Sequence, residues 1–325
     1  MTLERTSYAV LGTGALGGLY GGLLANSGLD VHFLMRSDYA YVREHGLRVD
    51  TPLGDFHLSK PKVVASVSAL PKVDVVLVCW KTTQNQQLAA ALHAACRPDT
   101  IVLVLQNGWD VERVAAEVVG EERVLGGCCF LCCNKVGPGH IHHLDFGRIG
   151  FGEYSESLSG SITDRMLRLT ADFTHASIDL QPTEDLRAMR WRKLMWNIPY
   201  NGLSVVLQAD THKIMSDPHA SLLAEELMNE VRDAAAACGK VIEASHIKKM
   251  LEDTRKMVPY DSSMLVDYRA GREMEVESIF GNPLRAALSA GYRPAKVEML
   301  YRQLSYLNPI HSPHGQEDRE RAALA

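Results

Sequence analysis

Short apolar runs alternate with helical stretches through the first half of the chain. The runs lie at residues 8–12, 30–35, 74–79 and 100–106, and a shorter one follows at 123–127. Because strands and helices in strict alternation are joined by crossover connections, this pattern predicts a mainly parallel sheet with helices on both faces. The fold class expected for the first half is therefore α/β and doubly wound.

One segment interrupts this alternation. Residues 46–59, GLRVDTPLGDFHLS, alternate apolar and polar side chains about a Pro-Leu-Gly-Asp turn. A period of two residues on both sides of a turn is typical of a β-hairpin. We expect a hairpin inserted among the parallel strands.

Strand signals end midway along the chain. From Glu184 to about Asn308 the sequence carries long amphipathic runs, such as SLLAEELMNEVRDAAAAC, which predict helices. A chain of 325 residues is also longer than one hydrophobic core supports, because such cores stop growing at roughly 250 to 300 residues. We expect a sheet domain at 1–182, an all-helical domain at 183–312 and a flexible polar tail at 313–325.

Composition argues against two classes of partner. The net charge of −5 gives no overall basic field, so nucleic acid is not an expected partner, although a local cluster can hold a small anion. Residues 6–29 carry no charge, but their seven glycines interrupt every apolar run, unlike a membrane span or a signal peptide. We therefore expect no membrane segment, and the cytoplasm is the default location.

A glycine motif follows the first apolar run. The sequence GTGALG contains Gly12, Gly14 and Gly17, with Ala15 and Leu16 between the last two. Glycines between a buried strand and a helix let the backbone approach a pyrophosphate, whose charge meets the amides and the positive end of the helix. The motif favours a dinucleotide-binding sheet of the Rossmann type over a glycine-rich helix that only packs closely.

The end of the second strand indicates which dinucleotide binds. An acidic side chain there holds the ribose of NAD, whereas an arginine accepts the 2'-phosphate of NADP. This position is occupied by Arg36, whose planar guanidinium suits a phosphate. NADPH is the cofactor we expect. Two alternatives stay open: a solvated loop arginine, or a register shifted by two residues that would place Asp38 at the ribose.

Two more polar residues follow strands at the same sheet edge. Lys81 comes directly after the run at 74–79 and its neighbour Trp80, and Asn107 comes after the run at 100–106. Open α/β sheets bind ligands at the carboxyl ends of their strands. We expect Lys81 and Asn107 to contact the cofactor, although either residue alone is an ordinary strand-end side chain.

A polar stripe marks the first helix of the second half. In RWRKLMWNIPYN, Lys193, Asn197 and Asn201 stand four residues apart and share one face of a helix. The neighbouring residues Trp191, Leu194, Met195 and Ile198 point elsewhere and are expected in the core. Asparagine is a poor helix former, so its recurrence on one stripe favours the wall of a polar cleft over an exposed face.

Cysteines cluster in GGCCFLCCNK, and three histidines follow at 140, 142 and 143. This composition raises a zinc or redox site as an alternative. Adjacent residues of a strand point to opposite faces, however, so these thiols cannot all converge on one ion. We expect buried thiols without a metal at Cys128, Cys129, Cys132 and Cys133.

Taken in order, these motifs resemble the ketopantoate reductase (2-dehydropantoate 2-reductase) family along nearly the whole chain. The resemblance rests on GTGALGG, the lysine of KT, QNG, GPGHIHH, RWRKLMWNIPYN and SSMLVDYRAGREMEVESIFG. It implies an NADPH-binding Rossmann domain, a helical domain like that of 6-phosphogluconate dehydrogenases, and a branched 2-oxo acid as the substrate. The reaction implied is the reduction of ketopantoate to pantoate, in pantothenate and coenzyme A synthesis.

The resemblance also implies roles for single residues. It assigns the general acid to Lys193, substrate contacts to Asn197, Asn201 and Ser263, and an active-site carboxylate to Glu275. By register the match falls on Glu275, although a solvated acidic face comprising Glu273, Glu275 and Glu277 is the alternative.

Three other readings of the function stay open. They are reduction of another branched 2-oxo acid, a hydroxyacid dehydrogenase that runs oxidatively, and a sensor that binds NADPH without turnover. Intact polar residues at the matched positions disfavour the sensor. Apolar helix faces in the second half are compatible with a homodimer.

Overall fold

The computed structural model describes residues 6–308. They form two compact units. The first unit contains residues 6–107 and 111–186, and the second contains 108–110 and 187–308. The change of unit at Leu186 lies close to the expected boundary after residue 182, and the expected tail at 313–325 falls outside the described residues.

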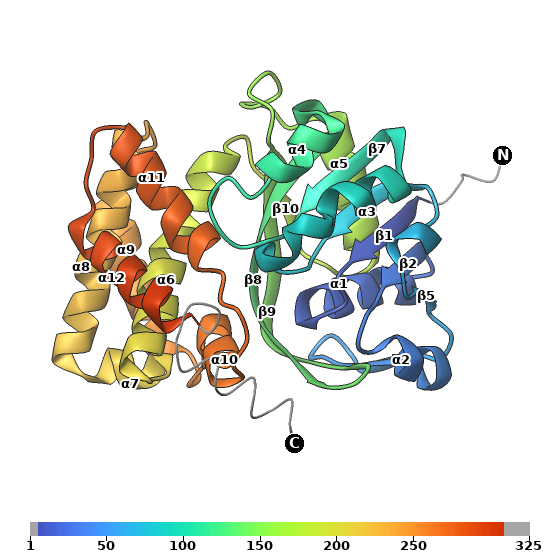
Figure 1. The fold of residues 1–325 in the computed structure, drawn as a ribbon, viewed down its shortest axis with the longest axis horizontal. Coiled ribbons are helices and arrows are strands. Elements are labelled where there is room, and N and C mark those ends of the chain that lie inside the picture. The colour runs from blue at the N-terminus through green and yellow to red at the C-terminus, as the bar shows by residue number, and fades with distance from the viewer. Residues whose placement is uncertain (1–5, 309–325) are drawn as a thin grey trace. The chain divides into compact units, whose positions relative to one another are not determined.

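The first unit is built on a single ten-stranded sheet (Figure 1). Its strands are β1 (Ser7–Leu11), β2 (Asp30–Leu34), β3 (Leu47–Asp50), β4 (Phe56–Leu58), β5 (Lys62–Val64), β6 (Val73–Val78), β7 (Cys96–Val104), β8 (Val124–Gly137), β9 (His140–Glu153) and β10 (Leu180–Pro182). They are ordered β4-β3-β9-β8-β7-β6-β1-β2-β5, and β10 pairs with β9. All neighbouring strands of the described sheet are parallel except β3–β4 and β8–β9, so the mainly parallel sheet and the inserted hairpin are confirmed.

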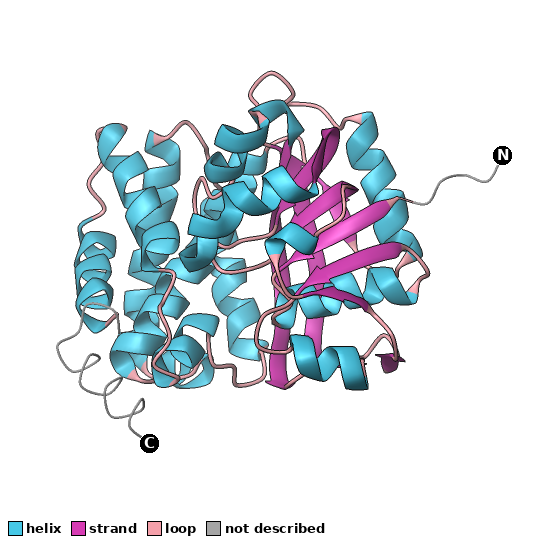
Figure 2. Ribbon diagram, turned by 45° about the vertical axis from the view of Figure 1, so that its right-hand side comes forward, coloured by secondary structure: helices cyan, strands magenta, loops and turns pink. Residues whose placement is uncertain are grey.

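Helices pack on both faces of this sheet (Figure 2). Strand β1 shows why, because its side chains alternate: Tyr8 and Val10 lie in one buried cluster, and Ala9 and Leu11 lie in another. The first cluster includes residues of α1 (Ala15–Asn26), α2 (Tyr39–His45) and α5 (Asp164–His175), and the second includes residues of α3 (Leu88–Ala95) and α4 (Arg113–Val119). The α/β fold class is confirmed.

The strand expected at 123–127 is much longer than the sequence indicated. Strand β8 continues for 14 residues, through the cysteine segment, and pairs with the equally long β9 in an antiparallel hairpin. Its pairing register shifts three times, between Phe130 and Leu131 and at two later points. The first ten residues of β8 are buried or half-buried without alternation, so the sequence did not mark where the strand ends.

The second unit is helical, and the described residues from 183 to 308 contain no strand. Its helices are α6 (Leu186–Leu207), α7 (Thr211–Ser216), α8 (Pro218–Ala237), α9 (Ala244–Lys256), α10 (Ser263–Arg269), the π-helical turn η4 (Glu277–Gly281), α11 (Asn282–Ser289) and α12 (Ala295–Leu307). The all-helical second half is confirmed.

Helix α6 contributes many buried residues to the core of the helical unit. Trp191, Leu194, Met195 and Ile198 are all at most 1% exposed, as their positions off the polar stripe predicted. The helix runs for 22 residues and continues through Pro199 to Leu207. The polar stripe is therefore carried on a helix that its apolar neighbours hold in place.

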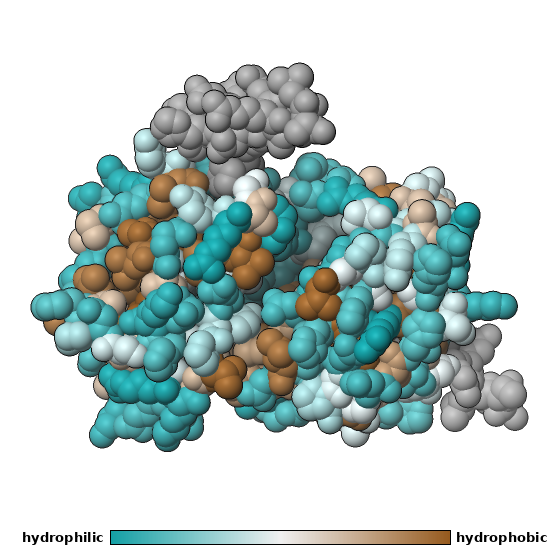
Figure 3. Space-filling view, turned by 90° about the horizontal axis from the view of Figure 1, so that it is seen from below, coloured by the Kyte–Doolittle hydropathy of each residue, from teal (hydrophilic) through white to brown (hydrophobic). Residues whose placement is uncertain are grey.

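Hydrophilic residues cover most of the face drawn in Figure 3, and apolar residues are exposed there in separate small groups. Exposed large apolar side chains of the helical unit include Leu222, Val241, Val258 and Met299. A homodimer stays a prediction.

Within residues 6–308, no helix combines the length and the apolar character that a membrane span requires.

Candidate cofactor and substrate residues

The three motif glycines occupy three different surroundings. Gly12 has a φ of +93°, and a Cβ there would lie 2.5 Å from the Cβ of Trp80. A Cβ on Gly17 would lie 2.9 Å from the Cβ of Cys79, because α1 packs closely on the sheet. A Cβ on Gly14 would meet nothing within 4 Å. Gly12 and Gly17 are thus required by the fold, whereas the space beside Gly14 is open to a ligand.

Helix α1 presents its amino end at this open space. It begins at Ala15 with Gly14 as its N-cap, and its first turn contains no acidic residue. The first amides of a helix have no partner inside the helix, and the helix dipole favours an anion there. The backbone of Gly14, Ala15 and Leu16 thus fits the pyrophosphate of a dinucleotide.

The alternative acid at the end of β2 is already engaged. Asp38 is buried and accepts hydrogen bonds from Lys135 Nζ at 2.6 Å, from Gly139 N at 3.0 Å and from Ser37 Oγ at 2.8 Å. Burial alone would raise the pKa of this carboxyl, but these donors outweigh it and lower the pKa below its ordinary value. Arg36, by contrast, is exposed just beyond β2.

Lys81 and Asn107 lie where parallel strands end. Lys81 directly precedes the 3-10 helix η2 (Thr82–Gln87) after β6, and Asn107 follows β7. Both residues are half-buried. Since β6 and β7 are parallel neighbours, the two residues lie at the same edge of the sheet as the glycine motif.

A polar network behind these residues was not predicted. Gln106 Nε2 donates to Asn85 Oδ1 at 2.7 Å and to the carbonyl of Trp80 at 3.0 Å, and Trp80 Nε1 donates to Asn85 Oδ1 at 3.2 Å. Gln106 is only 4% exposed. The network joins the loops after β6 and β7, and its only sequence signal was a glutamine at the end of an apolar run.

The residues after Asn107 pack with the helical unit, although they follow a strand of the sheet. Segment Gly108–Asp110 belongs to the second unit, where Trp109 N donates to the carbonyl of Ser278 at 2.8 Å. The centre of the Trp109 ring also lies 4.5 Å from the centre of the Trp191 ring. The sequence did not predict this position for the loop, because each of these contacts joins residues far apart in the chain.

Lys193, Asn197 and Asn201 lie on α6 at steps of four, and the polar cleft expected beside them stays a prediction. Asn197 and Asn201 are 3% and 2% exposed, and Lys193 is partly exposed with its Nζ 5.6 Å from the centre of the Trp196 ring. Asn197 Nδ2 is buried and finds no hydrogen-bond partner within residues 6–308. An unsatisfied buried donor costs about 1–3 kcal/mol, so its retention favours a ligand that accepts from it.

Two serines precede or begin α10, and they differ in burial. Ser263 is exposed at the first position of the helix, whereas Ser262 is fully buried as its N-cap. Ser262 Oγ accepts from Leu265 N at 3.1 Å and lies 2.6 Å from Ser204 Oγ. Because Ser204 stands on α6 three residues beyond Asn201, this contact ties α10 to the helix that carries the stripe.

Burial separates the three candidate glutamates. Glu275 is 8% exposed, just before η4, whereas Glu277 is exposed and Glu273 is intermediate. Glu277 accepts hydrogen bonds from Arg285 at 2.8 Å and from the hydroxyl of Tyr301. Glu277 therefore belongs to a solvated acidic face, whereas Glu275 does not.

The cysteine segment is part of the core of the first unit. Within the described residues, no disulfide joins any cysteine and no group of three His, Cys, Asp or Glu side chains is placed to hold a metal ion. His143 is buried, and its Nδ1 lies 2.9 Å from Thr51 Oγ1. The buried cysteines of β8 are Cys128, Cys129, Cys132 and Cys133.

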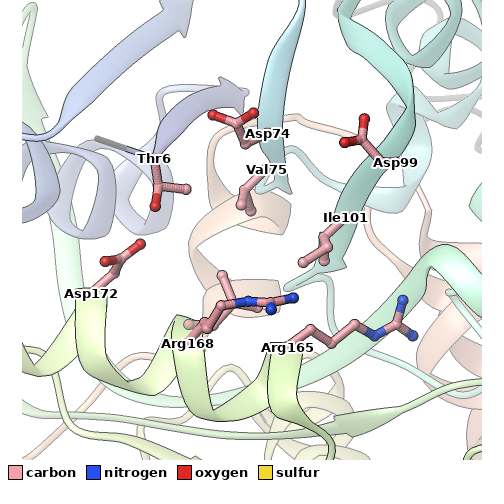
Figure 4. Close-up of a pocket in the computed structure, with 9 residues that line it drawn as sticks. Thr6, Asp74, Val75, Asp99, Ile101, Arg165, Arg168 and Asp172 are labelled. Atoms are coloured by element: carbon pink, nitrogen blue, oxygen red, sulfur yellow. The ribbon is translucent and has the colours of Figure 1, made fainter. Parts of the chain in front are cut away.

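A separate hollow of about 300 Å³ lies at the opposite edge of the sheet (Figure 4). It is lined at the amino ends of β6 and β7 by Asp74 and Asp99, and Arg165 and Arg168 of α5 face it. Some of its charged groups already have partners, since Arg165 pairs with Glu153. Ligands of open α/β sheets bind at the carboxyl ends of the strands, so this hollow is not the expected cofactor site.

A Rossmann-type sheet with a glycine loop after its first strand, followed by an all-helical unit, is a fold used by nicotinamide-dependent oxidoreductases. The chain belongs to one family of that class, the ketopantoate reductases. The family described as Ketopantoate reductase PanE/ApbA matches residues 8–156, and its C-terminal part, Ketopantoate reductase PanE/ApbA C terminal, matches residues 185–308. The family resemblance predicted from the sequence is confirmed.

Individual relatives agree with this assignment. A 2-dehydropantoate 2-reductase from Nostoc sp. is 48% identical over 94% of this chain and 96% of its own length. The crystal structure of 2-dehydropantoate 2-reductase from Geobacter metallireducens is 38% identical, with a TM-score of 0.89 over 92% of this chain and 99% of that one. The corresponding enzyme from Methylococcus capsulatus has a TM-score of 0.83 at 35% identity, covering 93% and 96%.

Proposed function

We propose that this protein reduces ketopantoate to pantoate with a hydride from NADPH, and that Lys193 is the general acid. The 48% identity to a 2-dehydropantoate 2-reductase supports the reaction. The observation that carries the catalytic part is the stripe on α6, where two buried asparagines follow Lys193 and one has an unsatisfied amide. A stripe of this kind suits a polar substrate better than it suits a protein core.

A nicotinamide cofactor follows from the family and agrees with the glycine loop. The choice of NADPH is part of the proposal, and it rests on Arg36 beyond β2 and on the engagement of Asp38 with Lys135. An arginine recognises a 2'-phosphate through paired donors, whereas an available acid would repel it. Lys81 and Asn107 are assigned to further contacts with the cofactor.

The reaction requires that negative charge on the ketone oxygen be stabilised and that this oxygen gain a proton. When bound, NADPH supplies a hydride to the ketone carbon, and negative charge then develops on the ketone oxygen. The ammonium of Lys193 stabilises that charge and donates the proton. Both effects act on the transition state, so the loss of Lys193 should lower kcat more than it weakens binding.

The remaining residues are assigned to binding and orientation. Asn197, Asn201 and Ser263 supply neutral donors for the carboxylate and hydroxyl of the substrate. Glu275 accepts a hydrogen bond from the substrate hydroxyl and helps to place Lys193. The burial of Glu275 supports its assignment over that of Glu277, whose carboxylate is engaged at the surface.

The main alternative is a reductase of a different branched 2-oxo acid, because the same stripe would serve any compact substrate of that type. Following NADPH absorbance with ketopantoate, 2-oxoisovalerate and pyruvate distinguishes these possibilities. We expect kcat/KM for ketopantoate to exceed that for pyruvate by about 100-fold or more, as discrimination by several polar contacts allows. Equal turnover of the three acids would overturn the substrate assignment, and no turnover of any acid would overturn the reaction.

A further inference from the structure

The loop after β2 is attached to the tip of the β8–β9 hairpin by a partly buried ion pair. Asp38 follows Arg36 by two residues and is the N-cap residue of α2. Its carboxylate lies 2.6 Å from Lys135 Nζ on β8 and also accepts from Gly139 N, in the turn between β8 and β9. The side chains of Asp38 and Lys135 are 10% and 33% exposed, so water screens this pair only in part.

A second ion pair near β2 differs from the first in place and surroundings. Lys62 Nζ lies 2.7 Å from Asp30 Oδ1, but Asp30 begins β2, at the end of the strand opposite Arg36. Its two side chains are 59% and 38% exposed. Both pairs join a lysine to an aspartate of the β2 region, and only the Asp38 pair stands beside the expected phosphate-binding arginine.

Charge explains why the position of Asp38 matters. Asp38 follows Arg36 by two positions, so their Cα atoms lie within about 7.6 Å of each other. This distance is shorter than the Debye length of about 8 Å at physiological salt. An uncompensated carboxylate at that range would repel a 2'-phosphate, and a carboxylate free to turn could accept from a ribose hydroxyl instead. Lys135 opposes both effects, because it neutralises the carboxylate and holds it in place.

We propose that Lys135 is a specificity-determining residue, which makes the Arg36 loop selective for a 2'-phosphate by neutralising and holding Asp38. This inference rests on the proposed use of NADPH. Lys135 acts through Asp38, so it is a positioning residue rather than a ligand of the phosphate. The segment that carries it follows the unusual cysteine-rich run, and no local sequence pattern links it to β2.

The test compares four variants of the full-length protein by isothermal titration calorimetry with NADP⁺ and with NAD⁺. They are Lys135→Met, Asp38→Asn, the double variant, and Lys62→Met as the matched control. Methionine keeps most of the side-chain volume and removes the charge. Thermal unfolding of each variant without cofactor checks that the fold is retained.

Lys135→Met should weaken NADP⁺ binding by about fivefold or more, with NAD⁺ binding unchanged or strengthened. The double variant should regain wild-type NADP⁺ affinity, because it lacks the carboxylate that Lys135 neutralises. Lys62→Met should leave both affinities unchanged. An unchanged ratio of the two affinities in Lys135→Met would overturn the inference, as would a double variant that binds NADP⁺ as weakly as the single one.

Arg36→Ala separates this inference from the proposed function. If the wild-type protein prefers NADP⁺, and Arg36→Ala loses that preference while Lys135→Met keeps it, only the role of Lys135 fails. If the wild-type protein binds NAD⁺ as tightly as NADP⁺, the proposed cofactor itself is wrong. A loss of stability in Lys135→Met with equal weakening of both cofactors would show a structural role and would also overturn the inference.

Discussion

The ring of Trp109 packs against the ring of Trp191, with centres 4.5 Å apart and planes inclined by 37°. Trp191 stands on α6 two residues before Lys193, so the loop that follows β7 contacts the helix that carries the proposed acid. Hydrogen bonds fix both sides of the Trp109 backbone, since its N donates to Ser278 and its carbonyl accepts from Asn282 Nδ2 at 2.9 Å. These contacts attach Trp109 to α6 and to the segment of Ser278 and Asn282.

Gly108→Ala should therefore destabilise the protein. Gly108 has a φ of +124°, and a Cβ there would lie 2.5 Å from the carbonyl oxygen of Ser278. Gly120→Ala is the matched control, because its φ is +89° but its Cβ would meet nothing within 4 Å. We expect thermal unfolding to show a loss of about 1 kcal/mol for Gly120→Ala and of about 2–4 kcal/mol for Gly108→Ala. Equal losses would show that the contact with Ser278 contributes nothing.

Gly14→Ala should impair cofactor binding without lowering stability. The added methyl group would contact no protein atom within 4 Å, and it would occupy the space assigned to the pyrophosphate. Calorimetry should show NADP⁺ binding weakened by about tenfold or more, with an unchanged Tm. Gly137→Ala is the control, since its Cβ would come no closer than 3.9 Å to the Cβ of His140. Unchanged NADP⁺ affinity in Gly14→Ala would contradict the assigned position of the cofactor.

Asn197→Leu should stabilise the protein and weaken substrate binding. The variant removes a buried amide donor that has no partner within residues 6–308 and replaces it with an apolar group of similar size. We expect a gain of about 1 kcal/mol in unfolding free energy and a rise of about tenfold or more in KM for ketopantoate. Asn229→Leu, which removes a hydrogen bond to the carbonyl of Glu225, should show neither effect. A destabilised Asn197→Leu with unchanged KM would point to a structural asparagine.

The glycine loop and the polar stripe could be predicted because each depends on neighbours along the chain. The motif at Gly12 follows a short apolar run, and the four-residue spacing of Lys193, Asn197 and Asn201 fixes their common face once the helix is expected. Burial of Trp191 followed from the same periodicity. Local patterns of this kind also predicted the parallel sheet and the helical second half.

Contacts between distant segments could not be predicted in this way. The local sequence leaves Asp38 as an alternative ribose ligand, because its partner Lys135 lies 97 residues further along the chain. The placement of Trp109 against Ser278, and the extension of β8 beyond residue 127, likewise depend on pairing with remote residues. A single sequence contains no local signal for such pairs.

The thiols of β8 should be unreactive in the native protein. Burial, and to a smaller extent Cys132, raises the pKa of Cys133 to about 12, so its reactive thiolate is scarce near neutral pH. Cys238 is only half-buried, although burial also raises its pKa. Alkylation near pH 8 followed by mass spectrometry should label Cys238 first, with the β8 cysteines labelled only after unfolding. Rapid native labelling of Cys133 would contradict its place in the core.

The most direct test of the account is the kcat of Lys193→Ala for the reduction of ketopantoate by NADPH. Because the ammonium is proposed to act in the transition state, kcat should fall by about 10²- to 10⁴-fold, while calorimetry shows unchanged NADP⁺ binding. Lys249→Ala, which removes a lysine whose side chain is 73% exposed, should retain the wild-type kcat. A Lys193→Ala protein with kcat within about twofold of wild type would contradict the assignment of the general acid.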